Sequence, residues 1–217
     1  MLKAIFFDND GVLVDTEHLY FAATRDTLAG LGVEVSEALF IDFSLRQGRS
    51  IFDLVRDRME PDEFEALRRV RNARYADLLR AGVAPLDGIP EVLAALHGRA
   101  PLAVVTSSNH DHFELIHAGT GLMRFFDFAV TNRDYERSKP HPDPYLAALA
   151  RAGCSADEAI AIEDSERGLA AARAAGLRCI VVPQGLTHGG SFAGAHRVLT
   201  SRANIVDVLA PLLSASA

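Results

Sequence analysis

The chain has 217 residues, of which 49% are hydrophobic and 24% charged, the composition of an ordinary globular protein. A net charge of −7 and the lack of any long Lys/Arg block argue against a nucleic-acid partner. No hydrophobic run in the sequence reaches the ~18 residues that span a bilayer, and two cysteines cannot build a disulfide framework or a four-ligand zinc site. We therefore expect a cytoplasmic protein with no nucleic-acid and no membrane partner.

Short runs rich in β-branched residues recur along the chain and predict buried parallel strands. They cover residues 2–7, 102–106, 128–131, 159–162 and 178–182, with a weaker run at 197–200. Segments with helical spacing lie between most of them, at 89–96, 112–120, 144–152 and 167–175. This alternation predicts an α/β fold with a Rossmann-like, doubly wound parallel sheet, in which ligands bind at the carboxyl ends of the strands.

One segment breaks the alternation. From about residue 16 to residue 80, hydrophobic residues recur at helical intervals and no strand pattern is present. We therefore predict a helical insertion at residues 15–84, within a core formed by residues 1–14 and 85–217. The insertion leaves the core just after the carboxyl end of the first strand, so it should cover the ligand site like a lid.

Two aspartates follow the first predicted strand directly. Asp8 and Asp10 are two residues apart, and Gly11 permits a tight exit from the strand. Turn or cap residues would look the same if this pair stood alone. The pair becomes a candidate site because polar residues also follow other strands.

Hydroxyl, amide and carboxylate side chains follow two later strands. The second long strand is followed by Thr106, Ser107, Ser108 and Asn109, which can donate hydrogen bonds to an oxyanion beside a helix N-terminus. Simple helix capping by Ser108 or Asn109 is the alternative. Residues 163–164, Glu and Asp, follow the strand at 159–162, and acids in a helix's first turn would explain them alone.

Lys139 is an unusual residue in this chain, because only two of its 22 basic residues are lysines. Pro140, Pro142 and Pro144 follow it closely and stiffen the loop that carries it. A stiff loop that presents a rare lysine suggests a fixed positive charge. The alternative is an ordinary solvated surface lysine.

Taken together, these residues predict a phosphoryl site. Asp8, Asp10, Glu163 and Asp164 would meet at one edge of the sheet, and four neighbouring carboxylates cannot all ionise unpaired. A divalent cation and Lys139 would supply about +3 of charge there. Ligation by oxygen alone suits Mg²⁺, and a cation next to hydroxyl and N–H donors suits a phosphoryl group.

These four segments, in this order, resemble the haloacid dehalogenase superfamily over nearly the whole chain. Residues 8–15 match its first motif, Thr106 the second, Lys139 the third and Glu163–Asp164 the fourth, and the insertion resembles the α-helical cap of subclass I. Residues 176–181 and 192–195 also resemble the relatives grouped as CbbY/phosphoglycolate-phosphatase-like. The resemblance implies an enzyme of the phosphoric monoester hydrolase class with a cap domain at 15–84.

The resemblance also implies a role for each matched residue. Asp8 would be the nucleophile that forms an aspartyl-phosphate, and Asp10 the general acid and then the general base. Thr106 and Lys139 would hold the phosphoryl oxygens, beside the donors at 107–109. Mg²⁺ would be bound by Asp8, by the main-chain carbonyl of Asp10 and by Asp164, with Glu163 acting directly or through water. Asp15 would bond the backbone of its own loop.

Two activities remain within this resemblance. Asp10 disfavours dehalogenation, and the lack of a lysine between Lys3 and Lys139 excludes phosphonate hydrolysis through an imine. A phosphatase acting on a small phosphate ester, such as a sugar phosphate, is favoured over a β-phosphoglucomutase-type mutase, because Tyr20 and Arg71 stand where that mutase would carry a histidine and a lysine. A receiver-like phospho-switch is disfavoured, because such domains are about half this length and carry the acceptor aspartate after a later strand.

Substrate contacts from the insertion are expected at a set of six positions: Thr16, Tyr20, Arg46, Gly48, Arg49 and Arg71. We expect the protein to be a monomer.

Overall fold

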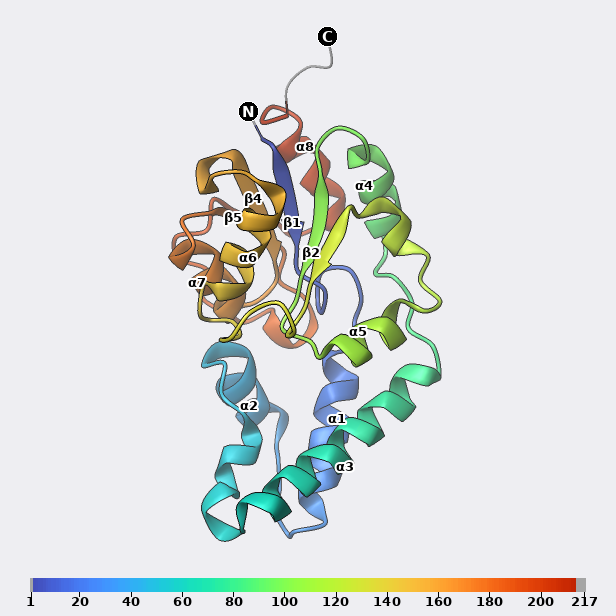
Figure 1. Cartoon of the computed structure of the whole chain (residues 1–217), viewed down its shortest axis with the longest axis vertical. Helices are drawn as coiled ribbons and strands as arrows, with labels where there is room; N and C mark the ends of the chain where they lie inside the picture. Colours follow the sequence, from blue (N-terminus) through green and yellow to red (C-terminus); the bar gives the residue numbers. More distant parts are fainter. Residues whose placement is uncertain (1, 214–217) are drawn as a thin grey trace.

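All six predicted strands are present in the structure, a computed structural model that describes residues 2–213 (Figure 1). They are β1 (Ala4–Phe7), β2 (Leu102–Val105), β3 (Phe128–Val130), β4 (Ala159–Glu163), β5 (Arg178–Val181) and β6 (Arg197–Val198). Every neighbouring pair is parallel, in the order β3-β2-β1-β4-β5-β6. The predicted α/β fold with a doubly wound parallel sheet is therefore confirmed.

The α-helices among residues 2–213 are α1 (Glu17–Ala29), α2 (Glu37–Phe40), α3 (Pro61–Arg80), α4 (Ile89–Leu96), α5 (His110–His117), α6 (Asp143–Ala152), α7 (Glu166–Ala174) and α8 (Ile205–Leu209). The four helices predicted within the core correspond to α4, α5, α6 and α7, and each begins within two residues of its expected position. None of the helices within residues 2–213 combines the length and the hydrophobicity that a membrane crossing requires.

The sheet is buried on both faces, which explains why its strands are almost continuously hydrophobic. Alternate residues of β1 point to opposite sides. Ile5 and Phe7 belong to a hydrophobic cluster with residues of α4, α5 and α8, whereas Ala4 and Phe6 belong to a second cluster with residues of α6 and α7. The two helical layers therefore fix the sheet from both sides and leave the carboxyl ends of its strands to face the insertion.

The insertion is helical, as predicted, and lies beyond the carboxyl ends of the strands, at the bottom of Figure 1. It comprises α1, α2, α3 and three short helical turns, η1 (Ile41–Arg46), η2 (Ile51–Leu54) and η3 (Arg56–Arg58). A hydrophobic cluster of its own includes Leu28, Phe40 and Phe52. Val14 and Pro85 form an antiparallel β-bridge, so the two chain segments that connect the insertion to the core lie side by side. The domain bounds of 15–84 stay a prediction that agrees with this arrangement.

Candidate active site

The three central strands end side by side, and this brings the candidate residues together. Phe7 of β1 pairs with Val104 of β2 and with Ile162 of β4, so Asp8 lies between the ends of both neighbours. Lys139 reaches the same point from the loop before α6. Its Nζ donates to Asp8 Oδ1 at 2.8 Å, to Glu163 Oε1 at 2.7 Å and to the Val105 carbonyl at 2.8 Å. Lys139 is thus a buried fixed charge rather than a surface lysine.

Asp8, Glu163 and Asp164 form a buried acidic cluster. Each offers a carboxylate oxygen, and these oxygens lie within 4.8 Å of one another. Burial, and then the charge of Glu163, raise the pKa of Asp8 to about 7 although Lys139 acts to lower it. Burial is also the main reason that the pKa of Asp164 lies well above its ordinary value. The charged form of this cluster therefore needs more positive charge than Lys139 supplies.

The donor set of the cluster fits a divalent cation. Within residues 2–213, the buried oxygens Asp164 Oδ1 and Glu163 Oε2 have no hydrogen-bond partner. Carboxylate oxygens without nitrogen or sulfur ligands suit a hard cation such as Mg²⁺. Asp8 and Asp164, with the nearby backbone of Asp10, are the residues that would hold it. Lys139 and the hydroxyl of Tyr145 both bond Oε1 of Glu163, which leaves its Oε2 free to act directly or through water.

Two glycines make room for the acidic side chains. A Cβ on Gly11 would lie 2.1 Å from Asp164 Oδ2, and the φ of Gly11 is +80°. A Cβ on Gly168 would lie 1.8 Å from Glu163 Oε2. Because any larger residue would displace these carboxylates, both glycines belong to the framework of the site.

Asp10 is held by hydroxyl groups from both parts of the chain. Its Oδ1 accepts a hydrogen bond from Thr16, in the insertion, and its Oδ2 accepts one from Ser108 of the core at 2.7 Å. Thr16 occupies the N-cap position of α1 but makes no side-chain cap bond there. The hydroxyl of Thr16 therefore serves a candidate catalytic carboxylate rather than its own helix.

The polar residues after β2 divide into cavity-lining and supporting groups. Ser107, Ser108 and Asn109 line the cavity, and within residues 2–213 the buried Ser107 Oγ has no hydrogen-bond partner. Asn109 also caps α5, since its side chain accepts from the Asp111 N–H at 2.9 Å. Thr106 is fully buried, and its Oγ1 accepts from the Ser108 N–H at 3.0 Å. Its hydroxyl thus supports the loop, although it also lies 3.5 Å from Asp10 Oδ2.

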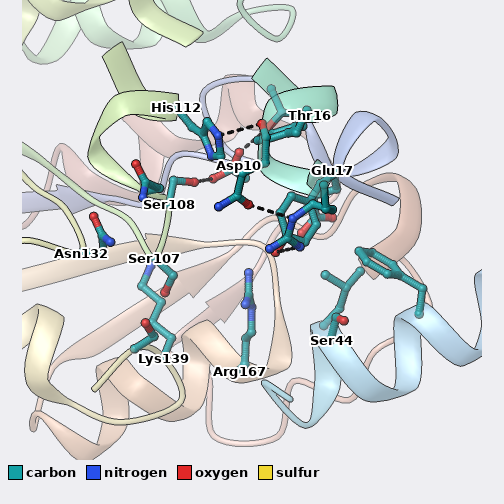
Figure 2. Close-up of a pocket in the computed structure, with 18 of the residues that line it drawn as sticks. Asp10, Thr16, Glu17, Ser44, Ser107, Ser108, His112, Asn132, Lys139 and Arg167 are labelled. Atoms are coloured by element: carbon teal, nitrogen blue, oxygen red, sulfur yellow. Dashed lines mark hydrogen bonds between the residues drawn. The ribbon is translucent and has the colours of Figure 1, made fainter. Parts of the chain in front are cut away.

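A cavity of about 300 Å³ lies between the core and the insertion (Figure 2). Its lining includes Asp8, Asp10 and Lys139 from the core. The insertion contributes several residues, among them three of the six predicted substrate contacts: Thr16, Tyr20 and Arg71. This volume falls at the small end of small-molecule sites.

The other three predicted substrate contacts do not line this cavity. Arg46 pairs with Glu166 of α7 at 3.0 Å, and Arg49 stacks on the ring of Phe43 at 4.5 Å. Gly48 packs against Pro140, where a Cβ would lie 2.5 Å from the ring. These residues join the insertion to the core or to itself.

Two lining residues with ionisable side chains, Glu17 and Arg167, were not singled out by the sequence. Glu17 is the first residue of α1, and burial raises its pKa to about 8, although Arg167 acts to lower it. Arg167 points into the cavity from α7, and the charges of Glu17 and Asp8 raise its pKa despite its burial (Figure 2). An acid that begins a helix and an arginine within one are common surface patterns, so the sequence offered no signal for either.

His117 and Asp15 also have roles that the structure specifies. His117 is buried, and its Nε2 lies 2.7 Å from Oδ1 of Asn9, the residue between Asp8 and Asp10. Its Nδ1 lies 3.0 Å from the hydroxyl of Thr120. Asp15, expected to bond its loop backbone, instead pairs with His18 at 3.2 Å on the surface.

Comparisons with known proteins identify the family. The family model described as haloacid dehalogenase-like hydrolase matches residues 5–182. The chain belongs to the haloacid dehalogenase-like hydrolase family. A protein named CbbY from Cereibacter sphaeroides is 32% identical, covering 98% of this chain and 100% of that protein. A fructose-1-phosphate phosphatase named YqaB from Escherichia coli K12 is 31% identical, covering 82% of this chain and 95% of that protein.

A solved structure of a family member agrees with this assignment. CbbY from Rhodobacter sphaeroides, in complex with xylulose-(1,5)bisphosphate, matches with a TM-score of 0.80 and 31% identity, covering 94% of this chain and 96% of that chain. The predicted superfamily and enzyme class are therefore confirmed, since relatives of this hydrolase family are named as phosphatases. The monomeric state and the cytoplasmic location stay predictions.

Proposed function

We propose that this hydrolase is a Mg²⁺-dependent phosphatase that cleaves a small sugar phosphate through an aspartyl-phosphate on Asp8. One observation carries the proposal. Asp8 lines the cavity at the end of β1, and Lys139 Nζ donates to one of its carboxylate oxygens at 2.8 Å. Asp10, two residues later, accepts hydrogen bonds from the hydroxyls of Thr16 and Ser108. A nucleophile, a fixed cation and a separate acid/base group thus line one cavity.

In the first step, a carboxylate oxygen of Asp8 attacks phosphorus while the ester P–O bond breaks. Asp10, protonated at this stage, gives its proton to the departing alkoxide oxygen. Lys139 and the hydroxyl of Ser107, which has no hydrogen-bond partner among residues 2–213, offset the negative charge that builds up on the phosphoryl oxygens. Bound Mg²⁺ would add positive charge beside the same oxygens.

In the second step, Asp10 is a carboxylate and takes a proton from water. The water oxygen forms a bond to phosphorus, and the acyl-phosphate bond to Asp8 breaks. Inorganic phosphate leaves, and both aspartates return to their starting states. Thr16 and Ser108 keep Asp10 aligned through both transfers, because each donates to a different carboxylate oxygen.

The substrate class is supported by the size of the cavity and by the relatives. A cavity of about 300 Å³ suits a small metabolite rather than a polymer. One relative is named as a fructose-1-phosphate phosphatase, and the CbbY structure contains a sugar bisphosphate. The mutase alternative is less well supported, because Tyr20 and Arg71 bond each other instead of offering a histidine and a lysine.

Steady-state phosphate release with Mg²⁺, over a panel of sugar phosphates, phosphoglycolate and nucleotides, tests the proposal. Asp8→Asn should abolish release and keep the fold, since asparagine has nearly the same shape, and Asp62→Asn on exposed α3 surface should not change the rate. Phosphate release by Asp8→Asn above the blank would refute the nucleophile. Conversion of β-glucose 1-phosphate to glucose 6-phosphate faster than release would establish the mutase instead.

A further inference from the structure

Thr187 lies in the loop at residues 184–191, which follows β5, and its hydroxyl bonds a candidate metal ligand. It is 5% exposed, and its Oγ1 donates to Asp164 Oδ2 at 3.1 Å. The other oxygen of this carboxylate, Oδ1, is buried and has no hydrogen-bond partner among residues 2–213. Thr187 is not among the described residues that line the active-site cavity. It therefore holds one oxygen of Asp164 from outside the cavity and leaves the other oxygen available to a cation.

The turn around Thr187 leaves its hydroxyl proton to Asp164. The Gln184 N–H donates to Thr187 Oγ1 at 3.0 Å, which fixes the oxygen in place. The Gln184 carbonyl lies 2.8 Å from the same oxygen, but it already accepts from the Thr187 N–H at 2.9 Å. A hydroxyl has one proton to donate, and a carboxylate is the stronger acceptor. The proton therefore favours the carboxylate of Asp164.

Residues on both sides of Thr187 contact the insertion. Leu186 packs against the hydrophobic cluster of the insertion, and the Gly189 carbonyl accepts from Arg46 Nη2 at 3.4 Å. Arg46 also pairs with Glu166 of α7 at 3.0 Å. The crevice that remains between this part of the insertion and the loop has a volume of only about 10 Å³. The position of Thr187 thus depends on how the insertion packs against the loop.

We infer that Thr187 is a positioning residue for the metal site, and that the 184–191 loop couples docking of the insertion to the affinity for Mg²⁺. A partner on one oxygen restricts rotation of the Asp164 carboxylate, so a cation meets an oxygen that is already oriented. Loss of the contacts at Leu186 and Gly189 would release the loop and, with it, the hydroxyl of Thr187. By linkage, bound Mg²⁺ must favour the docked insertion by the same factor. This inference rests on the Mg²⁺ site of the proposed function, but not on which ester is cleaved.

Isothermal titration calorimetry of Mg²⁺ into the metal-free chain tests the positioning role without any substrate. Thr187→Val keeps the shape and removes the hydroxyl, so the Kd for Mg²⁺ should rise by about 10-fold to 100-fold, the range for loss of a partner that orients a metal ligand. Thr187→Ser keeps the hydroxyl and should restore most of the affinity. Thr131→Val is the matched control, because Thr131 is also buried and its hydroxyl bonds Asp134, outside the acidic cluster, at 3.2 Å. Its Kd should equal that of the wild-type chain.

A variant in the insertion tests the coupling. Arg46→Gln removes the contacts with the loop and with α7, and should raise the Kd for Mg²⁺ by about 2-fold to 5-fold, the range for a partly exposed pair. Loss of a positive charge by itself would tighten the binding of a cation, so weaker binding reports docking. In the double variant with Thr187→Val, the Kd should equal that of Thr187→Val alone, because Arg46 acts through that hydroxyl. Arg56→Gln is the control, since Arg56 pairs with Asp53 inside the insertion.

The outcomes separate this inference from the proposed function. An unchanged Kd in Thr187→Val, with Tm lowered equally in Mg²⁺ and in EDTA, would show a purely structural threonine and overturn the inference. Additive effects of Arg46→Gln and Thr187→Val on the free energy of Mg²⁺ binding would overturn the coupling. If the wild-type chain binds no Mg²⁺, the proposed Mg²⁺-dependent function fails as well. Should Thr187→Val not fold, Arg46→Gln, at an exposed position, must still raise the Kd.

Discussion

Thr16, expected to contact the substrate, bonds the candidate acid/base residue Asp10 instead. A threonine directly before an acidic residue and a helix is a common N-cap pattern. Here its hydroxyl donates to Asp10, and the helix begins without a side-chain cap bond. The insertion thereby contributes a group to the candidate catalytic centre of the core through one hydrogen bond.

Thr16→Val tests that hydrogen bond, because valine keeps the shape and removes the donor. A hydrogen bond to a charged group contributes about 1.5–3 kcal/mol, which corresponds to a loss of about 10-fold to 100-fold in kcat. KM should change little, since the expected defect lies in the alignment of Asp10. Steady-state kinetics on the best substrate of the panel provide the measurement.

Thr24→Val is the matched control for this substitution. Thr24 lies on the same helix, is 1% exposed, and its hydroxyl has no hydrogen-bond partner among residues 2–213. Its replacement should leave kcat unchanged and should not lower stability. Equal kinetic effects of the two variants would mean that Thr16 acts through packing of α1 and not through Asp10.

His117 is a second residue whose role depends on burial. Burial lowers the pKa of His117 to about 4, against an ordinary value of 6.5. Between these values the unfolded chain binds more protons than the folded one, so the free energy of unfolding falls as the pH is lowered through this window. The loss amounts to about 3 kcal/mol in total, at about 1.4 kcal/mol per pKa unit.

Urea unfolding at pH 7 and at pH 4.5 measures this effect. His117→Gln cannot titrate, so the drop in unfolding free energy between the two pH values should be smaller in this variant than in the wild-type chain. His188→Gln, at an exposed position, should show the wild-type drop. An identical drop in all three proteins would exclude His117 as its source.

At the scale of elements, the strands were the most predictable part of the chain. Each is a short hydrophobic run bounded by polar residues, and burial on both faces leaves little other choice of conformation. The helical structure of the insertion was predictable, but the directions in which its side chains point were not. Its turn η1 is π-helical, which shifts the register of the residues after Ile41 relative to an α-helix. Arg46 therefore points toward α7 instead of the cavity.

The ion pair between Arg46 and Glu166 links two elements across the boundary of the insertion. The two charges are 3.0 Å apart, and Glu166 also accepts from the Ser191 N–H at 2.8 Å. Arg46→Glu should weaken the docking of η1 on α7 and raise KM by a factor of about 2 to 5, the range for a partly exposed pair. KM measured at low and at high salt is the test, and the effect should shrink at high salt.

A charge reversal distinguishes docking from a general effect of charge. The double variant Arg46→Glu with Glu166→Arg should recover most of the wild-type KM, because the pair is restored with opposite polarity. Arg56→Glu is the control, since Arg56 pairs with Asp53 inside the insertion at 3.0 Å and bridges nothing to the core. Failure of the double variant to recover would argue against the ion pair as the link.

At the scale of the whole molecule, the site forms where two separately built parts meet. The sequence could predict the convergence of Asp8, Glu163 and Lys139, because the carboxyl ends of parallel strands meet at one edge. It could not predict that Glu17 and Arg167 line the cavity, because this depends on how the insertion packs over the sheet. Family resemblance named the chemistry, whereas the buried Glu17 and Arg167 emerged from the structure.

The acidic cluster predicts that the metal stabilises the whole molecule. Bound Mg²⁺ at 100 times its Kd would add about 2.7 kcal/mol, which raises Tm by about 5–10 °C in a chain of this size. Burial raises the pKa of Asp8 to about 7 and that of Asp164 above its usual range, so protons compete with the metal as the pH falls. The Mg²⁺-dependent rise in Tm, relative to the value in EDTA, should therefore be larger at pH 8 than at pH 5.

A pair of variants locates the metal that causes this rise in Tm. Asp164→Asn should lose the rise, whereas Asp157→Asn, at an exposed position, should retain it. An equal rise in both variants would place the metal elsewhere.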